Sequence, residues 1–493
     1  MSRQNHPNTS FANKSAGVTS KLASWIYSTE IAEIPTSVQN RAKYLILDGI
    51  ACALVGAHLP WSETATKAIL NMEPKGDCTI IGWGSDNKVS PMASALINST
   101  FIQGFELDDV NMSSPLHNNS LLLPAILAAS KLKDPTTGAT KPYTGTDMLL
   151  SYIIGCEVGP RVGLALNGAD LLTRGWHSGT LMGPSSVAAC ISSLLQLPEP
   201  QIMSALGTAC TQAGGLMSAQ FGSDAKRMQH GFACRNGLLA ALLAQSGYTG
   251  IQDVYETPYG GFLSCFSAGS TMTPQSKPDE ITKDLGTRWE VNNISVKFHA
   301  AMAALHGTID AVSSLQKKYP EKFEEISKIT SIEARVGQAA FEHGGWIAPA
   351  DKPLSSVAAQ MSIQYAAACQ CIDRQVLMAQ FRGDKLNRPE LISLMHKVTP
   401  IHAEEGWATR VKITFDDSTV IEEGNLAPHF VKPGLSNEEI REKWHLLIRD
   451  LDGMSRERLE TIETLVLNIE QEGEGAINKL ADLLEGVVGC AIA

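Results

Sequence analysis

The sequence predicts a mostly α-helical protein that contains a smaller α/β part. Residues 18–270 read as successive helices rich in Ala, Gly, Leu and Ser. Near residue 270 the composition changes, and strand-like runs alternate with helices. After Pro433-Gly434 the helical pattern returns. We therefore expect a discontinuous all-helical domain that is interrupted by a smaller α/β domain and completed by the C-terminal helices.

The helical runs of the first part combine apolar positions at helical spacing with many small residues. Small residues let helices approach closely, so many of these helices should be buried on more than one side. Ser37 is a candidate N-cap for the first long run. The expected helices span residues 37–57, 91–104, 124–131, 145–164, 185–195, 199–208 and 234–247.

The α/β part should follow a linker rich in Pro, Ser and Thr at residues 270–278. A helix is expected at 356–368, and Asp416-Asp417-Ser418 should join the last two strands in a hairpin. Ser436 and Glu439 predict a capping box where helices resume. The expected strands are 294–297, 329–336, 408–415 and 419–423. The expected organisation is a disordered tail (1–16), a helical domain (17–270), an α/β domain (271–430) and the second part of the helical domain (431–493).

Composition excludes several classes of protein. A net charge of −11 and a pI near 5.6 argue against a nucleic-acid partner, so an anionic substrate must be held locally by a few cations. The ten cysteines lack the spacing of redox or zinc motifs and are expected to be reduced thiols. Neither a secretory signal nor a run of about 18 apolar residues is present, which predicts a cytoplasmic protein with no membrane partner. Metal, dinucleotide and P-loop motifs are missing, so no cofactor is expected.

Two motifs place charged or imidazole side chains beside apolar runs. Glu106-Leu107-Asp108-Asp109 puts three carboxylates within four residues, and they repel one another unless cations or amides hold them. His117 follows shortly after. His177 stands between glycines that let a ligand approach the backbone, ahead of a helix whose N-terminal amides could accept a carboxylate. A solvated acidic loop and a structural histidine in a tight loop are the alternatives.

Two basic stretches suit a polyanionic organic acid. Lys226, Arg227 and His230 form a short polar island between apolar runs, and Arg can grip a carboxylate with two parallel hydrogen bonds. Lys297 ends a predicted strand. His299 and His306 are seven residues apart and would share a face of one helix, although buried core histidines would show the same spacing. A solvated loop is the alternative for the island.

Together these segments resemble a known family. The strings AKYLILDGIACALVGA, ELDD with PLH, GWHSGT, TACTQAGGLMSAQFG, KRMQHGFACRNG and VKFHAAMAALHG, in order within residues 17–480, resemble the MmgE/PrpD family and most closely its fungal cis-aconitate decarboxylases. The resemblance implies a cofactor-free homodimer whose helical domain is topped by a lid domain, with the active site between them. It implies His117, His177, Lys226 and Lys297 as catalytic residues. The expected substrate-binding residues are Asp108, Asp109, Arg227 and His306.

The resemblance also implies the reaction. We expect decarboxylation of cis-aconitate, or of an alkylated analogue, to an itaconate-type product, with His117 or His177 as the proton donor. A dehydratase acting on 2-methylcitrate or a longer alkylcitrate, and a catalytically silent paralogue that binds a polycarboxylate, are the alternatives. Val110, Asn111 and Met302 depart from the family pattern and predict a more apolar pocket, which would suit an alkyl substituent.

Overall fold

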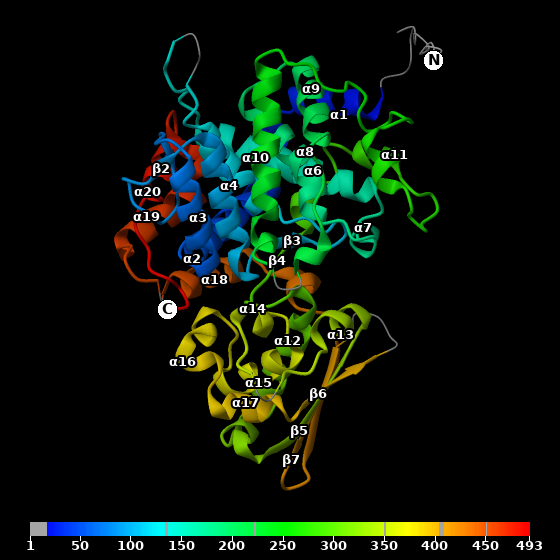
Figure 1. Cartoon of the computed structure of the whole chain (residues 1–493), viewed down its shortest axis with the longest axis vertical. Coiled ribbons are helices and arrows are strands. Elements are labelled where there is room, and N and C mark those ends of the chain that lie inside the picture. The colour runs from blue at the N-terminus through cyan, green and yellow to red at the C-terminus, as the bar shows by residue number, and fades with distance from the viewer. Residues whose placement is uncertain (1–16, 134–136, 221–222, 350–351, 404–408, 450) are drawn as a thin grey trace.

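The computed structural model confirms a mostly helical fold with a small mixed sheet. It describes residues 17–133, 137–220, 223–349, 352–403, 409–449 and 451–493. The expected disordered tail (1–16) and the first residue of the strand expected at 408–415 lie outside these ranges. Figure 1 shows a larger helical part and a smaller α/β part below it, and the C-terminal helices lie beside the first ones.

The larger part is built around helix α8, which packs against α5, α6, α9 and α10. Helix α2 packs against α4 on one side and against the C-terminal α18 on another. The first eleven helices are α1 (Val18–Ser28), α2 (Thr36–Gly56), α3 (Pro60–Met72), α4 (Pro91–Ile102), α5 (Asn119–Ala129), α6 (Gly145–Ala165), α7 (Asp170–Thr173), α8 (Ser178–Leu194), α9 (Glu199–Cys210), α10 (Ala225–Gln245) and α11 (Phe262–Ser267).

Small residues allow the helices to cross closely, as expected. A Cβ atom at Gly56 of α2 would lie 1.9 Å from the carbonyl oxygen of Phe101 in α4, so a larger residue would push these helices apart. The N-cap expected at Ser37 is wrong. Helix α2 begins at Thr36 after Pro35, and no side chain caps it.

Helix α5 begins at Asn119 instead of residue 124, and two helices with larger shifts affect the site. Helix α8 begins at Ser178 instead of residue 185, although Pro184 lies inside it. Proline has no N–H group, so Pro184 cannot donate to the carbonyl oxygen of Thr180 four residues earlier. The backbone amide of Gly214 donates to that oxygen instead, at 3.3 Å. Helix α10 begins at Ala225 instead of residue 234, so the expected polar island is the first part of a helix.

The α/β part carries a four-stranded sheet in the order β6-β5-β7-β8. Strand β5 pairs parallel with β6 and antiparallel with β7, and β7 pairs antiparallel with β8 through the predicted hairpin. The sequence predicts β5 correctly and misses β6, which contains Pro400. The strands are β5 (Ile329–Val336), β6 (Val398–His402), β7 (Thr409–Phe415) and β8 (Val420–Leu426).

Helices α12 and α15 pack against each other and against this sheet. The helix expected at 356–368 is instead two helices, α14 and α15. His299 and His306 do not share a helix, because α12 begins at His306 and His299 lies in the loop before it. The helices are α12 (His306–Lys318), α13 (Gln338–Gly344), α14 (Ser356–Gln360), α15 (Ile363–Asp373), α16 (Gly383–Leu386) and α17 (Pro389–Met395).

The C-terminal helices α18 (Asn437–Arg449), α19 (Arg456–Leu467) and α20 (Ala476–Leu483) contact the larger part. Helices α18 and α19 pack on α2, and α20 packs on α5. The predicted capping box is confirmed. The Glu439 carboxylate accepts from the Ser436 amide at 2.8 Å, and the Ser436 hydroxyl accepts from the Glu439 amide at 3.2 Å.

Helix α6 is long and apolar enough to cross a membrane, and α2 with α3 meets the same criterion as a bent pair. In α6, 89% of the apolar stretch is buried inside the protein. A buried core helix of a soluble protein meets the same criterion of length and composition. All ten cysteines are free thiols.

Candidate active site

The acidic motif lies on the turn between α4 and a short strand, β3 (Asp109–Asn111). Glu106 has a φ of 58°, in the left-handed region, so the chain turns sharply there. Strand β3 pairs antiparallel with β4 (Ile294–Val296), with Asp109 opposite Val296. Because the strands are antiparallel, Asp108 just before β3 comes to lie beside Lys297 just after β4.

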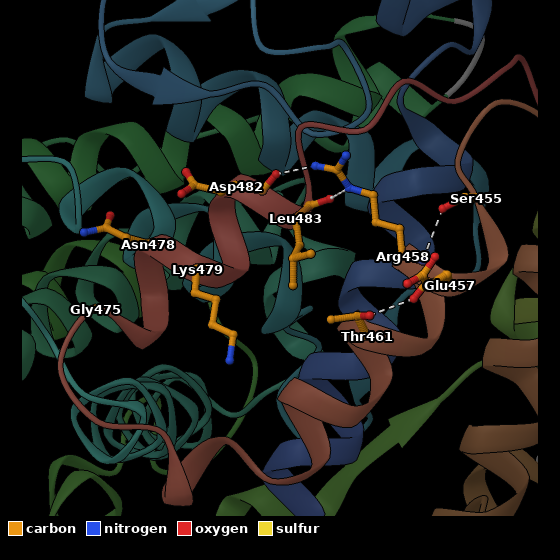
Figure 2. Close-up of a pocket in the computed structure, with 9 residues that line it drawn as sticks. All are labelled: Ser455, Glu457, Arg458, Thr461, Gly475, Asn478, Lys479, Asp482 and Leu483. Carbon is orange, nitrogen blue, oxygen red and sulfur yellow. Dashed lines mark hydrogen bonds between the residues drawn. The ribbon is translucent and has the colours of Figure 1, made fainter.

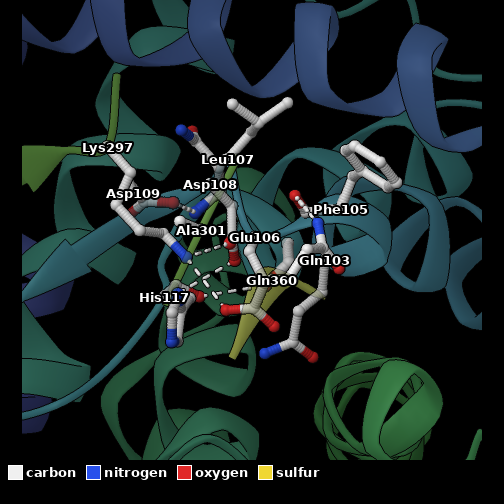
Figure 3. A network of polar contacts seen from close by, with 12 residues as sticks. Gln103, Phe105, Glu106, Leu107, Asp108, Asp109, His117, Lys297, Ala301 and Gln360 are labelled. Carbon is white, nitrogen blue, oxygen red and sulfur yellow. Dashed lines mark hydrogen bonds and ion pairs between the residues drawn. The ribbon is translucent and has the colours of Figure 1, made fainter. Parts of the chain in front are cut away.

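Three cations converge on the carboxylate of Glu106. Arg227 donates from Nη1 to Oε1 at 2.6 Å, Lys226 forms a short contact with the same oxygen, and Nζ of Lys297 lies 3.6 Å from Oε2. Burial favours the neutral carboxyl, but the three cations hold the pKa of Glu106 well below its usual range. Figure 3 shows Lys297 reaching between Glu106 and Asp108.

Asp108 joins Lys297 to His117. Its Oδ1 lies 3.0 Å from Nζ of Lys297, and its Oδ2 lies 2.9 Å from Nδ1 of His117. Burial opposes ionisation, yet His117 and Lys297 keep the pKa of Asp108 below its usual value. Burial likewise opposes the ammonium form of Lys297, but Asp108 and Glu106 raise its pKa above the ordinary value. Two carboxylates and three cations leave this cluster with one net positive charge.

Asp109, the third carboxylate of the motif, caps helix α5. Its two oxygens accept from the amides of Asn118 and Asn119 at 2.8 and 3.0 Å. Burial and the neighbouring charge of Asp108 raise its pKa to about 6. These contacts give Asp109 a structural role, and its predicted contact with the substrate stays a prediction.

The imidazoles of three histidines meet beside this cluster. The ring centroid of His230 lies 5.2 Å from that of His117 and 5.3 Å from that of His177. His177 is the N-cap residue of α8, and its Nδ1 lies 3.2 Å from the Thr180 hydroxyl. Burial, assisted by His117 and Lys226, lowers the pKa of His177 to about 3, so this ring is neutral at neutral pH.

His230 is fully buried and holds the group together. Its Nδ1 lies 2.6 Å from the hydroxyl of Ser120, which also lies 3.1 Å from the carbonyl oxygen of His117. Its Nε2 faces Gly179, where an added Cβ atom would lie only 1.8 Å away. Burial lowers the pKa of His230 well below its ordinary value. Gly179 is therefore needed to admit a neutral imidazole between the other two.

Comparison with known proteins decides the family. The MmgE/PrpD N-terminal domain matches residues 20–275, and the MmgE/PrpD C-terminal domain matches residues 299–469. The chain belongs to the MmgE/PrpD family.

Several relatives match this chain over nearly its full length. A cis-aconitate decarboxylase-like protein of Aspergillus oryzae is 42% identical over 95% of this chain and 97% of its own length. A cis-aconitate decarboxylase of Aspergillus terreus is 43% identical over 93% of this chain and 94% of its own length. A human cis-aconitate decarboxylase is 23% identical over 95% of each chain.

In this MmgE/PrpD protein, seven of the eight expected site residues lie in or directly beside the cluster, and His306 packs elsewhere. The His306 ring centroid lies 4.6 Å from that of Phe430 and 5.1 Å from that of His299, and its Nε2 lies 3.3 Å from the Ala301 carbonyl oxygen. Burial lowers the pKa of His306 well below its ordinary value, so it stays neutral. The role of His306 in substrate binding stays a prediction.

The sequence names Glu106 and His230 only as members of the acidic motif and the polar island, without a role of their own, and it does not single out Gln360. Gln360, the last residue of α14, accepts from Arg227 at 3.1 Å and donates to the Phe105 carbonyl oxygen at 2.9 Å, which ties the α/β part to the site. The spacing of residues in the sequence could have placed His230 in the site. His230 follows Lys226 by four residues, so on a helix the two share a face.

Lys226 and Arg227 also border a cavity of about 770 Å³, which we call the Lys226 cavity. Met302 lines it, whereas Val110 is buried in β3. A separate pocket between α19 and α20 is shown in Figure 2, where the Arg458 guanidinium donates to the carbonyl oxygens of Leu483 and Asp482. Among the described residues, no group of three or more His, Cys, Asp or Glu could hold a metal ion.

Proposed function

We propose that this protein decarboxylates cis-aconitate, or an alkylated analogue, to an itaconate-type product and carbon dioxide. The observation that carries this proposal is the buried cluster in which Lys226, Arg227 and Lys297 lie beside three imidazoles. The full-length relatives called cis-aconitate decarboxylases support it. A polycarboxylate is the ligand that best matches several cations within one small region.

The cations can bind a substrate while they keep their internal partners. An ammonium group has three donors and a guanidinium five, so Lys226, Lys297 and Arg227 retain donors beyond those used by Glu106 and Asp108. The internal carboxylates hold the cations in place before the substrate arrives, which lowers the reorganisation needed during the reaction. The net positive charge that remains attracts an anion into a protein whose overall charge is −11.

The chemistry follows from how electrons move through cis-aconitate. The bond between the methylene carbon and its carboxylate breaks, and carbon dioxide leaves. The electron pair forms a new double bond to the central carbon, and the electrons of the former double bond take up a proton at the far carbon. The product is itaconate. Charge develops on the far carbon and its carboxylate, where fixed cations stabilise it most.

His117 is the proton donor that the geometry favours. The Asp108 carboxylate at its Nδ1 holds the ring in place and stabilises a positive charge on it, so that Nε2–H can be given to the substrate. His177, with a pKa lowered to about 3, is neutral and suits a hydrogen bond to the substrate better than proton donation. A positioned acid contributes about 10²- to 10⁴-fold to the rate.

Product analysis with purified protein tests this proposal. Cis-aconitate and 2-methylcitrate are offered separately, and carbon dioxide and the organic products are measured by NMR. The proposal expects carbon dioxide and itaconate from cis-aconitate. Water loss from 2-methylcitrate without carbon dioxide from cis-aconitate would instead identify a dehydratase. Saturable binding of cis-aconitate with no product would identify a catalytically silent binding protein.

A further inference from the structure

The Lys226 cavity extends the candidate site beyond the space that a small tricarboxylate needs. Its volume of about 770 Å³ lies in the range of pockets that enclose drug-sized molecules, which is about 300–1,000 Å³. Its lining includes Lys226 and Arg227, the same cations that hold Glu106. A ligand whose carboxylate is bound by these cations can therefore extend into the cavity.

The cavity also has a wall of apolar side chains. They include Trp61, Met302, Trp346, Val357, Met361 and Leu386. Residues from the larger helical part and from the α/β part contribute to this wall, so the cavity lies where the two parts meet. An apolar wall favours binding of an apolar ligand group, because such a group leaves water when it contacts the wall.

Both indoles of this wall are held in place before any ligand binds. Trp61 lies under the Arg227 guanidinium, whose carbon is 5.4 Å from the ring centroid, and it stacks on Phe105 at 6.4 Å and 14°. Trp346 donates from Nε1 to the Met361 carbonyl oxygen at 2.9 Å. A preformed apolar wall costs little conformational entropy when a ligand binds.

Negative charge in the lining of the cavity limits which ligand groups can extend into it. Asp224 and Glu342 also border the cavity, and their carboxylates would repel a further anionic arm. A second carboxylate is thus disfavoured in this space, whereas an uncharged chain is tolerated. Lys226 and Arg227, in contrast, select a carboxylate on another part of the same ligand.

We propose that the Lys226 cavity binds an unbranched alkyl chain carried by the substrate, so that the preferred substrate is a cis-aconitate with an alkyl chain on one arm. This inference rests on the proposed decarboxylation and specifies its substrate class. Lys226 and Arg227 hold a carboxylate, and the chain lies against Trp61, Met302 and Trp346.

A homologous series tests the inference. Cis-aconitate and its methyl, propyl, butyl and hexyl derivatives, substituted on the methylene or the vinyl carbon, are assayed for carbon dioxide release. For one of the two positional series, kcat/KM should rise about fourfold for each added methylene group until the chain fills the cavity. If cis-aconitate reacts and every alkyl group lowers kcat/KM, the inference is overturned and the proposed function stands. If no compound releases carbon dioxide, both are overturned.

Cavity-filling variants locate the chain. Val357→Trp should lower the ratio of kcat/KM for the best alkylated substrate to that for cis-aconitate by about tenfold or more. Ala358→Phe, also in the wall, is a second variant in case the first does not fold. Val420→Trp places the same side chain on an exposed position of β8 and should leave the ratio unchanged. An unchanged ratio in a folded Val357→Trp or Ala358→Phe protein would overturn the assignment of the chain to this cavity.

Discussion

Replacing Lys297 with methionine should destabilise the protein by about 3 kcal/mol. The Lys297 side chain is almost fully buried, at 2% exposure, and its Nζ lies 3.0 Å from Asp108 and 3.6 Å from Glu106. Methionine has a similar length and no charge, so the change removes the cation while the new side chain still fills the space that Lys297 occupied. Removing one partner of a buried ion pair costs about 3–5 kcal/mol because the other charge remains buried.

The contacts that remain set the expected value at the lower end of this range. Asp108 keeps His117 at 2.9 Å, and Glu106 keeps Arg227 at 2.6 Å as well as Lys226. Without Lys297, burial should raise the pKa of Asp108 towards and above its usual value. The loss of stability should therefore be larger at pH 8, where both carboxylates are ionised, than at pH 5.

A double variant separates charge from packing. Changing Asp108 to asparagine in the Lys297→Met protein removes the carboxylate left without its cation, so stability should recover by about 1–2 kcal/mol. Lys328→Met is the matched control, because its partner Glu325 lies 2.8 Å away at the surface, with 49% and 64% of the two side chains exposed. That change should alter stability by less than about 0.5 kcal/mol.

Urea unfolding provides the assay. Tryptophan fluorescence and far-UV circular dichroism are followed together, and free energies are compared only where the two transitions coincide. A loss below about 1 kcal/mol for Lys297→Met, or a double variant less stable than the single one, would refute the view that Lys297 balances buried carboxylates.

Two further predictions concern Lys226 and Gly179. Because burial lowers the pKa of Lys226 to about 8, kcat/KM should fall about tenfold per unit above pH 8, whereas Lys226→Arg should lack this fall. Burying the protonated Lys226 amine lowers the free energy of unfolding, and this loss should disappear as the pH rises from 8 to 10.5. A kcat/KM that stays constant up to pH 10 would contradict the role of Lys226 as a substrate-binding cation. Gly179→Ala should cost about 1–3 kcal/mol and slow carbon dioxide release, because its Cβ would meet Nε2 of His230. Gly383→Ala, with open space around its Cβ position, is the control, and equal behaviour of the two variants would contradict the packing argument.

Local sequence patterns predicted the elements that local physics determines. Strand β5, the β7–β8 hairpin and the Ser436–Glu439 capping box all follow from short-range signals, and the structure confirms them. The start of α8 could not be read in this way, because Gly179 and Pro184 are typical of loops. Packing against α6 and α10, together with the Gly214 amide that replaces the bond lost at Pro184, makes this segment helical.

The pairing of charges was beyond what the sequence shows. The sequence does not distinguish an anion site from a solvated loop at Lys226 and Arg227, because their counter-ion, Glu106, comes from a turn 120 residues before Lys226. The three-residue pairing of β3 with β4, which brings Asp108 to Lys297, is too short to leave a periodic signal. Which residues approach one another was predictable only through the resemblance to the family.

The most direct test of the central claim is the single-turnover release of carbon dioxide from cis-aconitate by His117→Gln, His177→Gln and wild-type protein. His396→Gln, an exposed position at the end of α17, is the matched control and should react like the wild type. We expect His117→Gln to lower the rate constant about 10²- to 10⁴-fold, and His177→Gln to lower it less. Near-wild-type rates in both variants would show that the imidazoles beside Asp108 and His230 do not take part in the reaction.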